Sequence, residues 1–296
     1  MTKSASLREC LSHPRIAKAI GAHSAISAKL AEESGFDVVW ASGLEISALH
    51  AVPDANILSM SECLQVAASM AAATRLPVLA DCDSGFGNVN NVQHMVRSYE
   101  SAGIAGVCIE DKQFPKLNSF ADGSQELASI ADFAARMSAA TEARQDDDFV
   151  IVARLEAFIS GLGLEEALSR AAAYEEAGAD ALLIHSKKED AAEVSAFRRG
   201  YSGRLPVIAV PTTYHRVSAS ELEEQGFAMA IYANHALRSS IKAMRETLAR
   251  ISRDGSTHLL EADLAPVKEI FDLQGLPRML ESQERHENRG KEIAEV

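Results

Sequence analysis

The stretch YESAGIAGVCIED, residues 99–111, decides the fold of this chain. Its first part is helical in character and ends at Gly103, a residue that readily adopts the left-handed conformation that caps a helix. The run from Ala105 to Ile109 is continuously apolar, as expected for a parallel strand that is buried on both faces. Two acidic residues follow at once, so this stretch predicts a buried strand that ends in charged side chains.

The same unit, a helical stretch that ends in glycine followed by an apolar run, recurs along the chain. It appears as AEESGFDVVWAS at 31–42, YEEAGADALLIHS at 174–186 and LEEQGFAMAIYAN at 222–234. Further strand candidates lie at 16–20, 77–81, 149–154 and 206–210, which makes eight in all. Helical patterns lie between them, for example at 61–74, 89–102, 125–143 and 164–177. This alternation predicts a parallel sheet covered by helices.

Eight such units favour a closed (β/α)₈ barrel of the TIM type. A doubly wound open sheet is the alternative, but the chain has no GxGxxG after its first strand and no GxxxxGK[ST] phosphate loop. Two further helices are expected at 236–253 and 264–273, as a helical C-terminal extension. We therefore predict one barrel catalytic domain over residues 1–276 and a charged C-terminal tail over residues 277–296.

Composition narrows the classes of function. The chain has 296 residues, is 47% hydrophobic and 24% charged, and carries a net charge of −13. This charge argues against binding to nucleic acid or to an anionic membrane, although a metal ion or a few arginines still allow an anionic substrate. The chain shows no signal peptide and no membrane span, and its cysteines lack metal-ligand spacing (Cys10, Cys63, Cys82 and Cys108). A cytoplasmic location is expected.

Polar side chains follow nearly every predicted strand. Barrel enzymes place their chemistry at the C-terminal ends of the strands, so these side chains are expected to meet at one rim. This convergence favours an enzyme. The candidates, in chain order, are Ser42, Asp81, Asp83, Glu110, Arg154, His185, Thr212 and Asn234.

Three of these candidates are carboxylates. Asp81 and Asp83 alternate at the end of one strand, so both are expected to face one side of it, and Glu110 comes from the next strand. Carboxylates without cysteine or histidine partners suit Mg²⁺, or Mn²⁺ in its place. The alternative is that these side chains cap helices or pair with lysines.

Arg154 and His185 both end apolar runs. A buried charge at Arg154 needs an anion, which is either a substrate carboxylate or phosphate or a structural partner such as Glu156 or a rim aspartate. His185 is either a catalytic group or a hydrogen-bonded structural residue.

Other residues near the predicted rim also have two interpretations. Trp40 is by itself a core residue, while Ser42-Gly43-Leu44 offers backbone N–H groups that suit an oxyanion. Asp54 lies in a Pro-Asp-Ala-Asn sequence that is typical of a turn.

Several longer motifs are similar to those of the isocitrate lyase/phosphoenolpyruvate mutase superfamily, from about Leu7 to Leu276. They are VWASGLEIS at 39–47, AVPDANILSM at 51–60, DCDSGFGNVNN at 81–91, EDKQFPKLNS at 110–119, VARLEAFISGLG at 152–163, ADALLIHSK at 179–187 and ANHALR at 233–238. The resemblance implies a Mg²⁺-dependent barrel whose eighth helix is exchanged between paired subunits, usually in a tetramer that is a dimer of dimers.

The resemblance also implies roles for individual residues. Asp83 would bind Mg²⁺ directly, and the other carboxylates would lie around the ion largely through water (Asp81, Glu110 and Asp54). The backbone of Ser42, Gly43 and Leu44 would bind the pyruvyl oxygens, with Trp40 packed on the substrate. Arg154 and His185 would contact a phosphoryl group. The loop 112–120 would act as a gate that closes over the substrate and excludes water.

The gate separates the reactions of the superfamily. Its lyases carry a Lys-Arg-Cys-Gly-His type loop, whereas this chain reads Lys116-Leu117-Asn118-Ser119, so the missing cysteine argues against C–C cleavage. The mutases carry Asn-Ser here, and the related phosphonopyruvate hydrolases usually carry threonine in place of Asn118. We expect phosphoryl migration between phosphoenolpyruvate and phosphonopyruvate, with hydrolysis of phosphonopyruvate as the alternative and a non-catalytic barrel as a further one. The expected catalytic residues are Lys116, Asn118, Ser119, Arg154 and His185.

Overall fold

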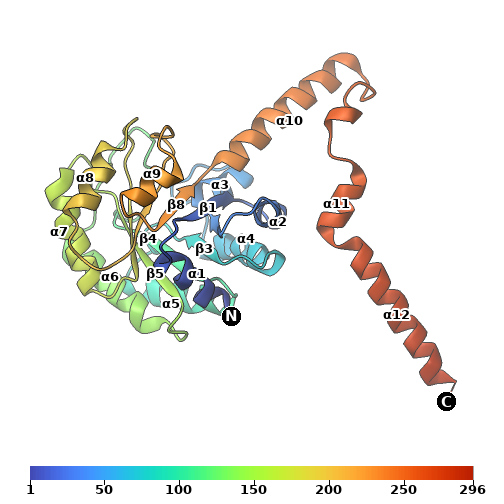
Figure 1. Ribbon diagram of the computed structural model, residues 1–296, viewed down its shortest axis with the longest axis horizontal. Helices are drawn as coiled ribbons and strands as arrows, with labels where there is room; N and C mark the ends of the chain where they lie inside the picture. Colours follow the sequence, from blue (N-terminus) through green and yellow to red (C-terminus); the bar gives the residue numbers. More distant parts are fainter. Residues whose placement is uncertain (296) are drawn as a thin grey trace. The chain divides into compact units, whose positions relative to one another are not determined.

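A closed barrel of parallel strands forms the centre of the unit Met1–Arg238 (Figure 1). The computed structural model describes residues 1–295. The eight strands follow one another around the barrel in sequence order, and β8 pairs with β1 to close it. The predicted (β/α)₈ architecture is confirmed. The strands are β1 (Ala17–Ala22), β2 (Val38–Ala41), β3 (Val78–Asp81), β4 (Gly106–Glu110), β5 (Val150–Leu155), β6 (Ala181–Ile184), β7 (Val207–Ala209) and β8 (Met229–Tyr232).

Helices surround the barrel and connect its strands (Figure 1). The glycines of the recurring unit all have left-handed φ angles, between 76° and 97°, where a side chain would strain the backbone (Gly35, Gly103, Gly178 and Gly226). They let each helix end and the chain turn at once into the next strand. The helices of this unit are α1 (Lys3–Ser12), α2 (Ala25–Glu33), α3 (Gly43–Leu49), α4 (Met60–Ala73), α5 (Val89–Ser101), α6 (Ile130–Ala143), α7 (Gly163–Glu176), α8 (Ala192–Gly200) and α9 (Ala219–Glu224).

The core has two layers. The larger one lies between strands and helices, and the second fills the inside of the barrel, with Trp40, Leu79 and Leu183 among its members. Leu7 of α1 belongs to this inner layer and lies against the start of β4, where a Cβ added to Gly106 would be 3.0 Å from it. The N-terminal end of the barrel is therefore packed with side chains, which leaves the opposite rim for a pocket.

The residues Ser239–Val296 form a second unit. It holds most of α10 (His235–Asp254), a 3₁₀ turn (Glu261–Asp263), α11 (Val267–Gln274) and α12 (Leu276–Ala294). The helices predicted at 236–253 and 264–273 are confirmed. In the chain as described, α10, α11 and α12 contain no buried residue. The predicted division at 276/277 and the exchange of the eighth helix stay predictions.

Two sequence expectations concern the surroundings of the protein. Within residues 1–295, none of the helices has the length and apolar character needed to cross a membrane. The four cysteines are free, and three of them are buried, namely Cys63, Cys82 and Cys108. The cytoplasmic location stays a prediction.

Candidate active site

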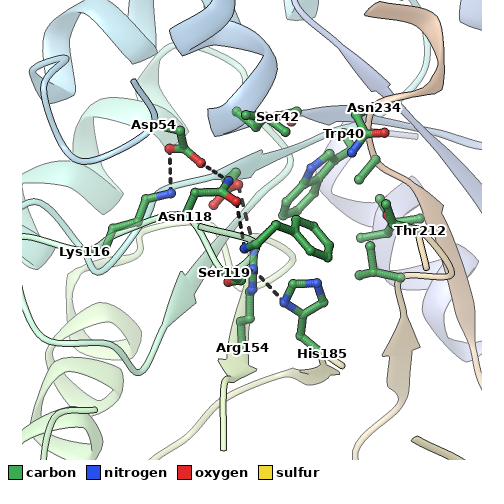
Figure 2. A pocket seen from close by; sticks show the side chains of 16 residues that line it. Trp40, Ser42, Asp54, Lys116, Asn118, Ser119, Arg154, His185, Thr212 and Asn234 are labelled. Atoms are coloured by element: carbon green, nitrogen blue, oxygen red, sulfur yellow. Dashed lines mark hydrogen bonds and ion pairs between the residues drawn. The ribbon is translucent and has the colours of Figure 1, made fainter. Parts of the chain in front are cut away.

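A small pocket of about 50 Å³ opens at the C-terminal ends of the strands (Figure 2). It brings together twelve of the residues predicted from the sequence: Trp40, Ser42, Leu44, Asp54, Asp81, Lys116, Asn118, Ser119, Arg154, His185, Thr212 and Asn234. Four further residues complete its wall: Phe120, Val210, Ile231 and Ala233. The predicted residues Gly43, Asp83 and Glu110 do not line the pocket but contact those that do.

Asp81 and Asp83 meet beside Gly43. A Cβ added to Gly43 would lie 3.1 Å from Asp81 Oδ2 and 3.3 Å from Asp83 Oδ1, so both carboxylates face the same spot and a side chain at position 43 would crowd them. The alternation argument does not explain this convergence, because β3 ends at Asp81. Instead Asp83 takes a left-handed φ of 50°, which turns its carboxylate inward. Such a conformation is costly and is typical of functional sites.

Two of the rim carboxylates are poorly compensated. Glu110 is 2% exposed, and its Oε1 has no hydrogen-bond partner among residues 1–295. Burial raises the pKa of Glu110 to about 7 and that of Asp83 to about 6, despite the opposing charges of Arg154 and Lys116. In both cases the cost of burying the carboxylate outweighs the nearby positive charges, and an added cation would lower both pKa values again.

These residues fit a largely hydrated Mg²⁺ ion. In the part of the chain that the structure describes, no three His, Cys, Asp or Glu side chains are grouped closely enough to hold a metal by themselves. Mg²⁺ does not need such a group, since it keeps several waters and is bound through one or two carboxylates. The oxygens of Asp83 and Glu110 that make no hydrogen bond suit it. Lys116 Nζ lies 2.9 Å from Asp83 Oδ1, although the contact does not have hydrogen-bond geometry.

The predicted gate lies over the pocket and is fastened to the turn at Asp54. Lys116 Nζ donates to Asp54 Oδ1 at 2.6 Å, and Asn118 Nδ2 donates to Asp54 Oδ2 at 2.6 Å (Figure 2). Asn118 N also donates to Asp54 O at 3.1 Å. Burial opposes the charge on Lys116, yet Asp83, Glu110 and Asp54 raise its pKa well above the ordinary value. Asp54 is therefore more than a turn former, because it fastens Lys116 and Asn118 of this loop beside the pocket.

Asn56 ties the gate to the carboxylate rim. Its Oδ1 accepts from Lys116 N at 2.5 Å, and its Nδ2 donates to Asp83 Oδ2 at 2.7 Å. Asn56 itself has a left-handed φ of 55°. One amide side chain thus fixes both the gate backbone and one oxygen of Asp83, which leaves the other oxygen facing Lys116.

Arg154 and His185 line the pocket, and the buried Glu156 contacts both of them from behind. Arg154 Nε donates to Glu156 Oε1 at 2.6 Å, and Arg154 Nη1 lies 3.9 Å from Asp81 Oδ2, so both structural partners expected for Arg154, Glu156 and a rim aspartate, are present. His185 Nδ1 lies 2.9 Å from Glu156 Oε1. Burial lowers the pKa of His185 against the opposing effect of Glu156, which favours a neutral ring at pH 7. Arg154 remains charged and lines the pocket, so an incoming anion meets a positive wall.

Some residues of the site were not singled out from the sequence. Asn56 has no signal beyond a turn motif, and Lys112 was recognised only as the start of the gate. The sequence places Glu156 at the end of the fifth predicted strand and offers it as a partner for Arg154. In the structure it lies one residue past the end of β5. Phe120 lies at the end of the gate and covers His185, with ring centroids 5.5 Å apart.

The chain matches the family model described as phosphoenolpyruvate phosphomutase over residues 7–252. It belongs to this family. A crystal structure of phosphoenolpyruvate phosphomutase from Streptomyces platensis subsp. rosaceus superimposes with a TM-score of 0.94 at 51% identity, covering 95% of this chain and 98% of that one. The superfamily predicted from the sequence motifs is thereby confirmed.

Relatives in the same family carry a second activity. The chain is 47% identical to the phosphonopyruvate hydrolase of Variovorax sp. (strain Pal2), across 94% of its length and 97% of the relative. A crystal structure of phosphonopyruvate hydrolase with oxalate and Mg²⁺ has a TM-score of 0.92 at 46% identity, over 96% of this chain and 99% of that one. Overall similarity therefore does not separate mutase from hydrolase, and the site has to be weighed residue by residue.

Proposed function

We propose that this chain is a Mg²⁺-dependent phosphoenolpyruvate mutase, which interconverts phosphoenolpyruvate and phosphonopyruvate. The main support for the proposal is the hydrogen bond between Asn118 and Asp54, which fastens the gate over a pocket of about 50 Å³. A mutase must keep water away from a phosphoryl group in transit, because water would capture it as phosphate. A tightly fastened gate meets this need.

In the proposed reaction the bond between phosphorus and C3 of phosphonopyruvate breaks, and its electron pair stays on the pyruvyl part as an enolate. The enolate oxygen then forms the new bond to phosphorus, so atoms and charge balance without any water. The phosphoryl group in transit is metaphosphate-like and needs positioning and positive charge more than covalent chemistry. Arg154 supplies the charge, and His185 and Asn118 would fix the orientation.

The pyruvyl part would lie on the opposite side, against Trp40, Ser42 and Leu44. Backbone N–H groups at the start of α3 would stabilise its oxygens, and Ser42 is held there by accepting a hydrogen bond from Glu45 N at 3.3 Å. Mg²⁺, when bound at Asp83, would stabilise the negative charge that develops on the enolate oxygen. Trp40 would restrict the movement of the enolate as it presents first C3 and then its oxygen to the phosphorus atom.

Hydrolysis of phosphonopyruvate is the second candidate, and the 47% identity to a hydrolase favours it. The difference lies in whether water reaches the phosphoryl group. Asn118 both donates to Asp54 and accepts from Phe120 N at 3.0 Å, so it joins the gate to the turn at Asp54. A threonine, expected here in the hydrolases, carries its donor and acceptor sites on one oxygen of a shorter side chain, so we expect it to lose at least one of these two contacts.

Phosphorus NMR with phosphonopyruvate and Mg²⁺ tests the proposal. A growing phosphoenolpyruvate signal, absent when Mg²⁺ is removed with a chelator, is the expected result. Phosphate as the first and only product would overturn the mutase assignment in favour of the hydrolase. No reaction with either Mg²⁺ or Mn²⁺ would favour a non-catalytic barrel.

A further inference from the structure

Glu156 is the most heavily engaged carboxylate near the pocket, yet it has no part in the proposed reaction. It follows β5, does not line the pocket and is 0% exposed. Burial alone would raise its pKa, but Arg154 and His185 together hold the pKa of Glu156 well below the usual value. A fully buried carboxylate that stays ionised is maintained by its partners, so the identity of those partners is informative.

The two oxygens of Glu156 face different parts of the site. Oε2 accepts from Ser119 Oγ at 2.6 Å and lies 3.4 Å from Lys112 Nζ, and both of these residues belong to the gate. Oε1 accepts from Arg154 Nε at 2.6 Å and lies 2.9 Å from His185 Nδ1, in the wall that faces the phosphoryl position. One carboxylate thus joins the closed gate to that wall.

Ser119 strengthens this junction because its hydroxyl makes three contacts. It donates to Glu156 while accepting from Lys112 Nζ at 2.8 Å and from Arg154 Nη2 at 3.2 Å. A hydroxyl has one donor and two acceptor sites, so all its capacity is used. Opening the gate would remove this hydroxyl from both Glu156 and Arg154 at once.

The proton on His185 is fixed by the same carboxylate. Nδ1 lies 2.9 Å from Glu156 Oε1 and 3.0 Å from Arg154 Nη2. Glu156 can only accept and Arg154 can only donate, so one tautomer cannot satisfy both. A bare nitrogen lone pair would be repelled by the ionised carboxylate, which is the nearer of the two partners, so we assign the proton to Nδ1 as the donor to Glu156.

A buried hydrogen-bond network fixes the backbone of Glu156. Its backbone N donates to Asp111 Oδ1 at 2.9 Å, and Asp111 Oδ2 in turn accepts from Arg170 Nη1 at 3.0 Å and from Tyr174 OH at 2.9 Å. Asp111, Arg170 and Tyr174 are all buried. A carboxylate on a fixed support can transmit a change on one of its oxygens to the other, since it cannot simply follow the group that moves.

We propose that Glu156 is a positioning residue that makes gate closure and the orientation of Arg154 and His185 a single event. In this proposal the phosphoryl-binding wall is correctly arranged only while Ser119 and Lys112 of the gate rest on Glu156. This inference rests on the proposed function, which identifies the group bound by this wall as a phosphoryl group. Ser119 and Arg154 donate to different oxygens of Glu156, and Lys112 forms an ion pair with it, so Glu156→Gln, which replaces one acceptor oxygen by a donor NH₂ of similar shape, must break one side of the junction.

A double-mutant cycle between Glu156→Gln and Ser119→Ala tests the coupling. Affinity for oxalate in the presence of Mg²⁺ is measured by calorimetry, and kcat by the consumption of phosphonopyruvate. Glu156→Gln should weaken oxalate about tenfold or more, as for the loss of a charge-assisted hydrogen bond, and lower kcat on the order of a hundredfold. The fold loss in affinity and in kcat of the double variant should be smaller than the product of the two single fold losses, by a factor of about ten or more. The reason is that both substitutions break the same junction.

The control variant is Glu175→Gln on α7, which also removes a carboxylate that accepts from a hydroxyl, Tyr201 OH at 2.5 Å, but lies outside the pocket. It should leave oxalate affinity and kcat unchanged. If Glu156→Gln fails to fold, Lys112→Met breaks the other gate contact and enters the same cycle with Ser119→Ala.

The proposal would be overturned if Glu156→Gln kept the wild-type kcat. It would also be overturned if the fold loss of the double variant equalled the product of the two single fold losses.

Failure of the proposed function would give a different experimental result. If the wild type releases phosphate, or does not turn over phosphonopyruvate, the mutase assignment falls, but the oxalate cycle still shows whether Glu156 and Ser119 are coupled.

Discussion

At the scale of single residues, the site holds negative charge in a place where it is poorly stabilised. Asp83 and Glu110 have raised pKa values because they are buried, and Lys116 is the cation nearest to Asp83. Strongly shifted pKa values are common at functional sites. The excess of carboxylate oxygen at the rim is thus the residue-level reason to expect Mg²⁺.

Removing Asp83 tests that expectation. Asp83→Ala should abolish Mn²⁺ binding, read by electron paramagnetic resonance, and reduce kcat/KM on the order of a thousandfold, since a bound metal contributes several kcal/mol to charge stabilisation. Glu175→Gln serves as the control and should bind Mn²⁺ as the wild type does. Undiminished Mn²⁺ binding by Asp83→Ala would remove Asp83 from the metal site.

In the proposed function, Asn118 controls which of the two candidate reactions occurs. Asn118→Thr should loosen the gate by the loss of a hydrogen bond to the charged Asp54, which corresponds to roughly tenfold or more frequent opening. The share of phosphate among the products of phosphonopyruvate, measured by phosphorus NMR, should rise accordingly. A product ratio equal to that of the wild type would show that Asn118 does not control access of water.

The residues at strand ends could be predicted to belong to the site, because a barrel places the C-terminal ends of all its strands at one rim. The sequence therefore indicated Arg154, His185 and the carboxylates without any knowledge of contacts. The roles of Asn56 and Lys112 could not be predicted in this way, since they depend on how the gate folds back over the rim. The left-handed backbone of Asp83 is a local feature of the same kind.

At the scale of elements, α2 is tied to the chain after α4 by one carboxylate. Glu32 Oε2 accepts from Thr74 Oγ1 at 2.6 Å and from Arg75 N at 2.9 Å, and Glu32 Oε1 accepts from Arg75 Nε at 2.6 Å. These contacts, led by the hydrogen bond from Thr74, lower the pKa of Glu32 from 4.5 to about 2. The link holds the residues that lead into β3, the strand that ends at Asp81.

The pH dependence of stability follows from this shift. Because the folded pKa is below the unfolded one, Glu32 stabilises the fold above about pH 4.5, and this contribution is lost as the pH falls from 4.5 towards 2. Glu32→Gln should therefore be less stable than the wild type in urea unfolding at pH 6, and the difference should shrink as the pH approaches 3. Glu33→Gln, at an exposed neighbouring position, is the control. A difference that stays constant with pH would contradict the assignment.

The strands were predictable as elements because each is an apolar run between a helix-ending glycine and a polar residue. Strand alternation does not extend over residues 81–83, since β3 ends at Asp81 and a turn follows it. Periodicity describes regular elements well and carries no information about the irregular turns that follow them.

At the scale of the whole molecule, α10 carries an exposed apolar stripe. Ile241, Met244 and Leu248 are 39%, 55% and 65% exposed and recur at helical spacing. The sequence resemblance predicted that the eighth helix is exchanged between subunits of a tetramer, which would cover such a stripe.

Light scattering should therefore find a particle of about four times the 31.8 kDa chain mass. Leu248→Glu should shift the mass to smaller species, because a charge would be buried in the interface. Lys242→Glu, at a highly exposed position on the same helix, is the control and should leave the mass unchanged. A monomeric wild type would contradict helix exchange.

In the proposed reaction the closed pocket moves a phosphoryl group within one substrate molecule and keeps water out. Turnover of phosphonopyruvate with Mg²⁺ in ¹⁸O-labelled water, followed by phosphorus NMR and mass spectrometry, tests this directly. The expected product is phosphoenolpyruvate whose phosphoryl group contains no oxygen from the solvent. Phosphate that carries one solvent oxygen as the primary product would contradict it and identify the enzyme as a hydrolase.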